Sequence, residues 1–337
     1  MSTNRTFTLE HRPDGELKDS DLKLHEQSVA SPAEGRIQIR TSCISLDPTN
    51  RIWMSDAPQY MPPIALGEVV RALGVGHVEQ SNHPDFAEGD RVIGLVGWAT
   101  HPTLDPSAGG LQKLPAELSM PDPKVLSLLS PTSGFTAYVG LLDLAEPREG
   151  ETLVVDAAAG SVGSLVGQLG KIRGCRVVGI AGGPEKCGYV TDTLGFDACI
   201  DYKNEDVGPA LTRHCPDGID VCFENVGGEI FDAILMRMNN FGRVTLCGMI
   251  SGYNEVDSRQ PGPYAFGMVL IRRLTVRGFV VSDHADRFEA ITRDLLKWAG
   301  EGKIQTREDV REGFEGLPEA LRQLLRGEKH GKLVLKP

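Results

Sequence analysis

The segment of this sequence best suited to chemistry is a small-residue turn at positions 157–163. The apolar run Thr152–Val155 precedes it, and apolar residues at helical spacing follow it between Val162 and Ile172. The turn has the spacing Ala157-x-x-Gly160-x-x-Gly163, a variant of the glycine fingerprint of dinucleotide-binding strand–turn–helix units. Free N–H groups and the dipole at the start of such a helix attract a pyrophosphate. The segment therefore predicts a dinucleotide site, with a glycine-rich turn inside an ordinary α/β core as the alternative.

The end of the next expected strand indicates which nicotinamide cofactor binds. Folds that prefer NAD carry an acidic residue about 20 positions beyond the glycines, where it holds the adenine ribose. Here the segment Gly179–Gly183 contains no carboxylate, and Lys186 follows it. An ammonium group at this place attracts a 2′-phosphate, so NADPH is favoured over NADH. The alternative is that Lys186 is only a solvated helix residue, as most lysines are.

The elements that must position these residues fall into two parts. Residues 1–126 contain short apolar stretches between turn-forming residues, which is typical of β structure. Between 127 and 300 strands and helices alternate, which indicates a doubly wound parallel sheet with helices on both faces. The predicted fold is thus α/β, with a Rossmann domain at 127–300 and a β-rich domain made of 1–126 and 301–337. The expected strands are Arg36–Leu46, Gly67–Val75, Arg91–Val96, Thr152–Val155, Arg176–Ile180, Cys199–Asp201, Ile219–Glu224, Arg243–Cys247, Thr275–Val281 and a tail strand, Gly331–Lys336, that returns to the first domain; Glu185–Leu194 is expected to be helical.

Composition excludes several classes of partner. With 40% hydrophobic and 24% charged residues, the chain has the make-up of a soluble globular protein. The net charge of -11 and the lack of a Lys/Arg-rich tract argue against nucleic acid, because phosphate backbones require clustered cations. No apolar run is long enough to span a bilayer and the first residues are polar, so we expect a cytoplasmic protein without a membrane partner. Its seven cysteines are scattered, which fits neither a disulfide framework nor a cysteine-rich zinc site.

Several segments together resemble the leukotriene B4 12-hydroxydehydrogenase/prostaglandin reductase family. The resemblance runs from Ser45-Leu46-Asp47-Pro48 to the C-terminus, and it is strongest at Ala157–Gly163, Gly179–Lys186, Asp201–Lys203, Asn225–Gly228 and Cys247–Asn254. The family includes bacterial curcumin reductases and plant alkenal double-bond reductases. The resemblance implies a GroES-like domain beside the Rossmann domain, a homodimer, and a small-molecule substrate. It also implies NADPH-dependent reduction of the carbon–carbon double bond in α,β-unsaturated ketones or aldehydes.

The resemblance also assigns cofactor contacts to particular positions. It places Lys186 and Tyr202 at the 2′-phosphate, and Lys329 stands where the family often carries an asparagine that touches the cofactor. The remaining implied contacts are Gly160, Ser161, Val162 and Gly163 at the pyrophosphate, Asn225, Cys247, Gly248, Ile250, Ser251 and Tyr253 along the ribose and nicotinamide, and the backbone of Phe279, Val280 and Val281 near the carboxamide.

The substrate pocket departs from the family pattern. Thr49 and Asn50 replace a frequent tyrosine and methionine, and Ile271 stands where some members place a substrate-facing tyrosine. We therefore expect a remodelled pocket, with Asp47, Trp53, Tyr60, Tyr264 and Ile271 as candidates, and with Trp98 and Phe266 considered beside the other aromatic residues. The two tryptophans are equally expected as core residues, and Asp47 is also expected to form a structural ion pair with Arg51.

A metal site is not expected. Zinc dehydrogenases of the wider superfamily need a histidine after the glycine of a Gly-His-Glu segment, whereas Leu66-Gly67-Glu68-Val69 has none. Cys43 alone, without a nitrogen ligand or clustered thiolates, cannot build a tetrahedral zinc site in the usual way.

A conjugated enone suits a metal-free site, because its β-carbon is already electrophilic. The cofactor supplies hydride, and the protein orients the substrate and stabilises the enolate. Tyr253 is the expected hydrogen-bond donor to that oxygen, because a phenol with a pKa near 10 donates without ionising at neutral pH. The alternative is that Tyr253 only packs against the cofactor. Alternative functions are NADP-dependent alcohol oxidation, quinone reduction, or cofactor binding without turnover.

Overall fold

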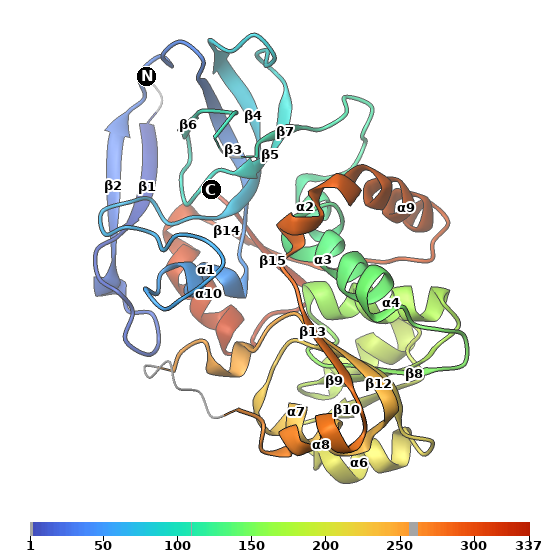
Figure 1. The fold of residues 1–337 in the computed structure, drawn as a ribbon. Coiled ribbons are helices and arrows are strands. Elements are labelled where there is room, and N and C mark those ends of the chain that lie inside the picture. Colours follow the sequence, from blue (N-terminus) through green and yellow to red (C-terminus); the bar gives the residue numbers. More distant parts are fainter. Residues whose placement is uncertain (1–2, 109, 256–261) are drawn as a thin grey trace. The chain divides into compact units, whose positions relative to one another are not determined.

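The computed structural model describes residues 3–108, 110–255 and 262–337, and it divides into two compact units (Figure 1). The first unit is built from Met1–Leu126 and Glu308–Pro337. The second is built from Ser127–Tyr253 and from a later segment that ends at Arg307.

A six-stranded parallel sheet forms the centre of the second unit, as the alternating pattern predicts. Its strand order is β10-β9-β8-β11-β12-β13. The order runs outward in both directions from β8 and β11, so the crossover direction reverses between these two strands. Ligands of such sheets bind outside the carboxyl ends of the strands at this point. The strands are β8 (Thr152–Val155), β9 (Arg176–Ala181), β10 (Ala198–Asp201), β11 (Ile219–Glu224), β12 (Met238–Leu246) and β13 (Thr275–Gly278).

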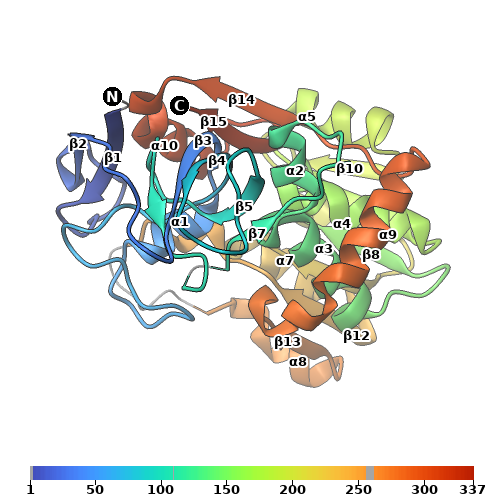
Figure 2. The same cartoon turned by 90° about the horizontal axis from the view of Figure 1, so that it is seen from above.

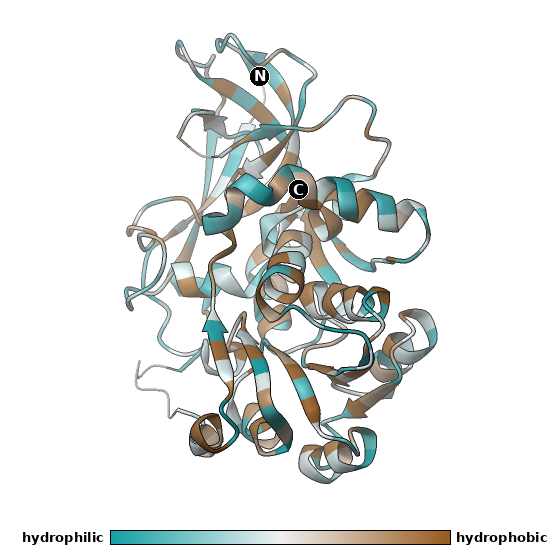
Figure 3. Cartoon of the chain, turned by 45° about the vertical axis from the view of Figure 1, so that its right-hand side comes forward, coloured by the Kyte–Doolittle hydropathy of each residue, from teal (hydrophilic) through white to brown (hydrophobic). Residues whose placement is uncertain are grey.

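Helices cover both faces of this sheet, which explains why strands such as β8 are mostly apolar and wholly buried. Helices α3, α4 and α9 lie on one side, and α6, α7 and α8 lie on the other (Figures 1 and 2). Hydrophobic and hydrophilic residues alternate along these helices, as expected for helices that cover a sheet (Figure 3). Their bounds are α3 (Thr136–Tyr138), α4 (Ser161–Ile172), α5 (Pro184–Gly188), α6 (Val207–His214), α7 (Gly228–Arg237), α8 (Gly267–Ile271) and α9 (Phe288–Gly300).

The helical stretch Asp122–Ala145 is long and apolar enough to cross a membrane by length and composition alone. It contains α2 (Asp122–Leu128), α3 and two π-helical turns, Pro131–Phe135 and Val139–Ala145. In the structure 83% of its most apolar window is buried inside the fold. This burial is that of a core helix in a globular protein.

The first unit holds two sheets. Strands β1 (Thr3–Leu9) and β2 (Leu22–Ser28) form an antiparallel pair. The larger sheet has the order β14-β15-β3-β4-β5-β7, with β6 paired to β3. The C-terminal strand β15 lies between β14 and β3, which confirms the predicted return of the tail to this part of the chain. The other elements are β3 (Ile37–Ser45), α1 (Pro48–Trp53), β4 (Leu73–Ser81), β5 (Arg91–Leu95), β6 (Thr103–Leu104), β7 (Gln112–Lys113), β14 (Glu308–Glu312), α10 (Leu317–Leu325) and β15 (Lys332–Lys336).

Three strand predictions are wrong in their limits. The expected strand Thr275–Val281 ends at Gly278, and Val281 begins a 3-10 helix. The expected strand Gly67–Val75 begins only at Leu73, because Gly67 lies in a turn with φ +83° and its N–H donates to the carbonyl of Leu9. Strand β12 starts at Met238, five residues before the expected Arg243, and includes Phe241 at φ +65°. Sequence patterns do not indicate the irregularities at Gly67 and Phe241, because both depend on pairing partners far along the chain.

Candidate functional site

Six loops leave the sheet of the second unit at the carboxyl ends of its strands. Because all six strands are parallel, these loops meet at one edge of the sheet. The structure therefore brings together the cofactor residues predicted within this unit, although they come from segments far apart in sequence. The loops are those after β8 (156–160), β9 (182–183), β10 (202–204), β11 (225–227), β12 (247–253) and β13 (279–280).

The N-terminus of α4 offers backbone N–H groups for a pyrophosphate. Gly160 is the residue before the helix, and no side chain caps the first turn there. The N–H groups of Ser161, Val162 and Gly163 have no carbonyl four residues earlier within the helix, so an anion can accept from them. The helix starts very close to the preceding turn, since a Cβ on Gly163 would lie 2.5 Å from the carbonyl oxygen of Ala157.

A cationic cradle lies at the ends of β9 and β10. A Cβ on Gly182 would lie 2.9 Å from the Tyr202 hydroxyl and 3.0 Å from Cε of Lys203. Both side chains therefore lie directly over this glycine, and a larger residue would displace them. Gly183, at φ +97°, then turns the chain into α5, which carries Lys186.

Lys186 and Lys203 converge on this cradle. Burial and the positive charge of Lys203 lower the pKa of Lys186, while Glu185 opposes that shift. Two ammonium groups close enough to repel each other form a natural site for a dianion such as a 2′-phosphate. Lys203 is a residue that the sequence analysis did not place in the site. Its charge and its position directly after the third strand of the parallel sheet were the available signal.

The Asp201 carboxylate holds the same loop in place through hydrogen bonds. Its carboxylate accepts hydrogen bonds from the backbone N–H of Gly183 at 2.7 Å, from that of Lys203 at 3.1 Å and from the Asn204 amide at 2.7 Å. Burial alone would raise the pKa of Asp201, but these hydrogen bonds lower it below its ordinary value. The carboxylate thus stays ionised and fixes the backbone on which the cradle stands.

The loops after β11 and β12 are joined by hydrogen bonds. Asn225 and Val226 accept from the backbone N–H groups of Ile250 and Ser251, at 3.1 and 3.0 Å, and the Ser251 hydroxyl also donates to the carbonyl of Val226 at 2.6 Å. The hydroxyl oxygen of Tyr253 accepts from the N–H of Met249. Asn225 and the residues from Cys247 to Tyr253 are therefore parts of one hydrogen-bonded structure.

The loop after β13 is held by aromatic packing. A Cβ on Gly140 would lie 2.8 Å from the ring of Phe279 and 2.6 Å from that of Phe223. The Phe279 side chain is thus directed into the unit, which leaves its backbone and those of Val280 and Val281 as the groups available near the cofactor edge.

Asp47 has a structural environment in the first unit. It precedes α1, is buried, and pairs with the buried Lys332 while accepting from the Ser45 hydroxyl. The expected pair between Asp47 and Arg51 is wrong, because the Arg51 guanidinium donates to the carbonyls of Pro13 and Gly15 instead. Asp47 has extended backbone before α1, whereas Arg51 lies inside this helix, so the two side chains reach different partners.

The other predicted residues of this unit have varied surroundings. Trp53 is only 4% exposed and lies against the Arg71 guanidinium, and Trp98 is fully buried, so both are core residues. Tyr60 is half exposed, and its hydroxyl is hydrogen-bonded to that of Thr49. Lys329 also belongs to this unit, and its ammonium donates to the carbonyl of Gly331 at 2.9 Å.

Tyr264 and Ile271 lie on the surface of the second unit. Tyr264 is 88% exposed, and Ile271 ends α8 shortly before the amino end of β13. That end of the sheet is opposite to the cofactor loops. The structure therefore does not bring Ile271 to these loops within the chain.

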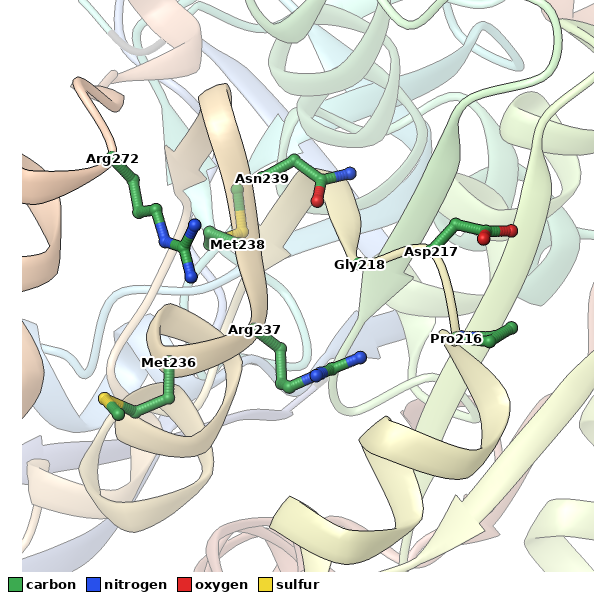
Figure 4. Close-up of a pocket in the computed structure, with 8 residues that line it drawn as sticks. All are labelled: Pro216, Asp217, Gly218, Met236, Arg237, Met238, Asn239 and Arg272. Carbon is green, nitrogen blue, oxygen red and sulfur yellow. The ribbon is translucent and has the colours of Figure 1, made fainter.

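Two small cavities also lie at the amino ends of the strands. One of about 220 Å³ is lined by residues 216–218 and 236–239 and by Arg272 (Figure 4). Another of about 310 Å³ is lined by Arg148, Glu151, Asp220, Thr275 and residues 240–243. Both are at the edge opposite to the predicted site, so neither corresponds to it.

Metal-binding groups are dispersed in the described parts of the chain. Within residues 3–108, 110–255 and 262–337, no three His, Cys, Asp or Glu side chains gather as a metal site would need. Cys43 is buried, and burial together with Asp122 raises the pKa of its thiol to about 12.

Known proteins resemble this chain along its whole length. Residues 5–114 match the family model described as the N-terminal domain of oxidoreductase, and residues 161–298 match the model described as zinc-binding dehydrogenase. NADPH-dependent curcumin reductase of Escherichia coli (strain K12) is 43% identical, with 99% of this chain and 96% of that protein aligned. Prostaglandin reductase 1 of Rattus norvegicus is 38% identical, with both chains fully covered. The crystal structure of CurA in complex with NADPH from Vibrio vulnificus superimposes with a TM-score of 0.92 at 41% identity, covering 98% of each chain.

Proposed function

This chain belongs to the medium-chain dehydrogenase/reductase family, in the group of curcumin reductase and prostaglandin reductase 1, and we propose that it reduces the carbon–carbon double bond of α,β-unsaturated ketones and aldehydes with NADPH. The observation that carries the proposal is the cradle formed by Gly182, Lys186, Tyr202 and Lys203 at the carboxyl edge of the sheet. It contains two converging cations where an enzyme that prefers NAD would have an acidic residue.

The described residues fit NADPH at three places. The N-terminus of α4 at Gly160–Gly163 would hold the pyrophosphate, and the cradle would hold the 2′-phosphate. The joined loops with Asn225 and Cys247–Tyr253, and the backbone of Phe279–Val281, would lie along the ribose and nicotinamide. Lys329 is retained as a candidate contact from the first unit.

The chemistry of the bound cofactor is hydride donation, which requires the substrate β-carbon to be held in reach. In our proposal Tyr253 donates its O–H to the carbonyl oxygen of the enone and stabilises the negative charge that develops there. The Met249 N–H, by donating to the Tyr253 oxygen, orients this phenol. Water supplies the proton that the α-carbon takes up.

The proposed reaction needs no metal ion. The support is the identity of the side chains, since the segment Leu66–Val69 lacks the histidine of the Gly-His-Glu segment in zinc dehydrogenases. The candidate ligand Cys43 is buried and kept as a neutral thiol by its raised pKa.

A homodimer is part of the proposal. Strand β13 forms one edge of the parallel sheet, and Phe241, Leu270 and Ile271 expose apolar side chains beside it. A two-fold axis at this edge would pair the sheets of two copies and cover these side chains. Light scattering after gel filtration should give twice the chain mass. Leu270→Glu should yield monomers, whereas Leu66→Glu, at an exposed apolar position of the first unit, should not.

We also place the enzyme in the cytoplasm. All seven cysteines are free thiols, which suits a reducing compartment, and the chain's overall composition is that of a globular protein.

The test of the main proposal follows the absorbance of the reduced nicotinamide with a panel of enones, enals and a quinone. Consumption of NADPH with the saturated ketone as product, identified by mass spectrometry, is the expected result, with NADH much slower. Consumption with the quinone alone would favour quinone reduction, and tight NADPH binding without consumption would favour a non-catalytic protein.

A further inference from the structure

Two buried carboxylates lie side by side beneath the cofactor loops. Val155 of β8 pairs with Phe223 of β11, so the next residues, Asp156 and Glu224, occupy neighbouring positions at the ends of these strands. Both side chains are fully buried. They also share a donor, because the N–H of Val226 lies 3.2 Å from Oδ2 of Asp156 and 2.8 Å from Oε1 of Glu224. This is the point of the sheet where the crossover direction reverses.

The surroundings of the pair do not compensate two negative charges. The titratable groups that interact with it are the thiols of Cys222, on the same strand as Glu224, and Cys247, after β12. Burial raises the pKa of both thiols, to about 12 for Cys247, so they stay neutral. Two adjacent buried carboxylates in such a site cannot both ionise without a large cost in free energy.

One proton held by the pair removes the cost of a second buried charge. It also supplies a donor to a carboxylate oxygen that otherwise accepts no hydrogen bond within the part of the chain that the structure describes. Oε2 of Glu224 is buried and accepts no hydrogen bond from the described residues, so it is the acceptor that a protonated Asp156 would satisfy. Burial and the adjacent Glu224 raise the pKa of Asp156 well above its usual range, and burial raises that of Glu224 as well. The two groups therefore titrate as a pair.

The pair holds the turn after β11. Asp156 accepts the backbone N–H of Asn225 at 2.7 Å and its side-chain amide at 3.2 Å, and Glu224 accepts the N–H of Gly227 at 2.6 Å. In turn, the backbone carbonyls of Glu224, Asn225 and Val226 accept N–H groups of the next loop, those of Cys247, Gly248, Ile250 and Ser251. Two of the six cofactor loops thus depend on these carboxylates.

We propose that Asp156 and Glu224 share one proton and act as positioning residues that hold the Asn225–Gly227 turn, and with it the Cys247–Ser251 loop, in the conformation that binds NADPH. The inference rests on the proposed function only for the identity of the cofactor. Neither residue touches the reacting atoms in this proposal, so each acts through the backbone that it holds.

The first experiment compares NADPH dissociation constants by calorimetry for three variants. In Asp156→Asn the amide supplies both the acceptor for Asn225 and a permanent donor to Glu224, so we expect affinity within about threefold of wild type. Asp156→Ala removes both and should weaken binding by about tenfold or more. Asp220→Asn is the matched control, because Asp220 is a carboxylate on β11, the strand of Glu224, but lies at the amino end of that strand, away from the cofactor loops. It should leave the NADPH affinity unchanged.

The second experiment measures the melting temperature of the cofactor-free protein between about pH 5 and pH 9. A raised pKa in the folded state stabilises the protein below the ordinary pKa of a carboxyl group, and this stabilisation is lost as pH rises through the raised value. Asp156→Asn cannot lose this stabilisation, because its amide does not ionise as pH rises. Relative to wild type, this variant should therefore gain about 2–4 °C as pH rises, and Glu224→Gln should show the same trend.

These measurements separate the possible outcomes. Parallel melting curves for wild type, Asp156→Asn and Glu224→Gln would overturn the shared proton, even if Asp156→Ala fails to fold. Wild-type affinity in a folded Asp156→Ala would overturn the positioning role. Neither readout needs an enone, so a wild type that binds NADPH but reduces no enone would refute the proposed function and leave this inference intact.

Discussion

The phenolic oxygen of Tyr253 accepts a hydrogen bond from the backbone N–H of Met249, at 3.0 Å, and lies over Gly248. A Cβ on Gly248 would come within 3.0 Å of that oxygen, so the glycine provides the space for the phenol. A phenol that accepts one hydrogen bond keeps its own O–H as a donor. The loop after β12 thus holds a donor in a fixed position rather than on a freely rotating side chain.

Replacing Tyr253 by phenylalanine should lower kcat for enone reduction by about a hundredfold, the scale expected when a positioned proton or hydrogen-bond donor is lost. The ring remains, so the NADPH dissociation constant should change by less than about fivefold, mainly because the Met249 N–H loses its acceptor. Steady-state kinetics and calorimetry on the same preparation give both numbers. Equal losses in kcat and in cofactor affinity would instead indicate a packing role.

Replacing Lys186 or Lys203 by alanine should reduce kcat/KM with NADPH by about 10–100-fold, because each removes a charge-assisted contact to the 2′-phosphate. Rates with NADH should stay nearly unchanged, since NADH lacks that phosphate. Arg213→Ala is the control, because Arg213 is an exposed cation of α6 paired with Glu205 and lies outside the cradle. A parallel loss with NADPH and NADH in the lysine variants would contradict the assignment of the cradle.

Alkylation should begin at Cys187. A hydrogen bond from Cys199 lowers the pKa of the Cys187 thiol, whereas burial contributes to raised values at Cys199 and Cys247. As pH falls, Cys187 should therefore retain its thiolate longer than the other two and keep reacting with iodoacetamide. Mass spectrometry of digests after short exposure identifies the labelled residue. NADPH should slow the labelling, because Cys187 follows Lys186 in α5; first labelling at Cys247 would count against this prediction.

Replacing Lys332 by methionine should lower the free energy of unfolding by about 3–5 kcal/mol, because Asp47 then remains buried without its cation. The double variant Asp47→Asn with Lys332→Met should recover part of this loss, since no buried charge remains. Urea unfolding monitored by tryptophan fluorescence measures both. If the double variant is as unstable as the single one, the ion pair is not the source of the loss.

The sequence was most informative about the second unit, for a physical reason. Its parallel strands are buried on both faces and therefore form short apolar runs, and each cofactor loop follows its strand directly. Gly160 and Lys186 were predicted from their places after the first and second strands of the sheet, whereas Tyr202 and Asn225 were assigned through the family resemblance.

Long-range partners were not predictable in the same way. Asp47 and Lys332 are 285 positions apart and meet because β15 pairs with β3. Local sequence offered Arg51 as the nearer cation, and that choice was wrong. Likewise, Asp156 directly precedes the recognised motif, but its partner Glu224 is defined only by the pairing of β8 with β11. Substrate residues were hardest to place, because the candidates share no regular pattern: Asp47 and Trp53 are buried, whereas Tyr60, Tyr264 and Ile271 are exposed.

The position of β15 has a consequence for the order of folding. This strand lies between β14 and β3 although it follows β3 by most of the chain, so the larger sheet of the first unit stays incomplete until β15 has been synthesised. Strands β8 to β13 of the second unit precede β15 in the chain and are therefore available earlier. The N-terminal strands, although made first, are thus expected to finish folding late, and during that interval the open edge of β3 is what chaperones would need to protect.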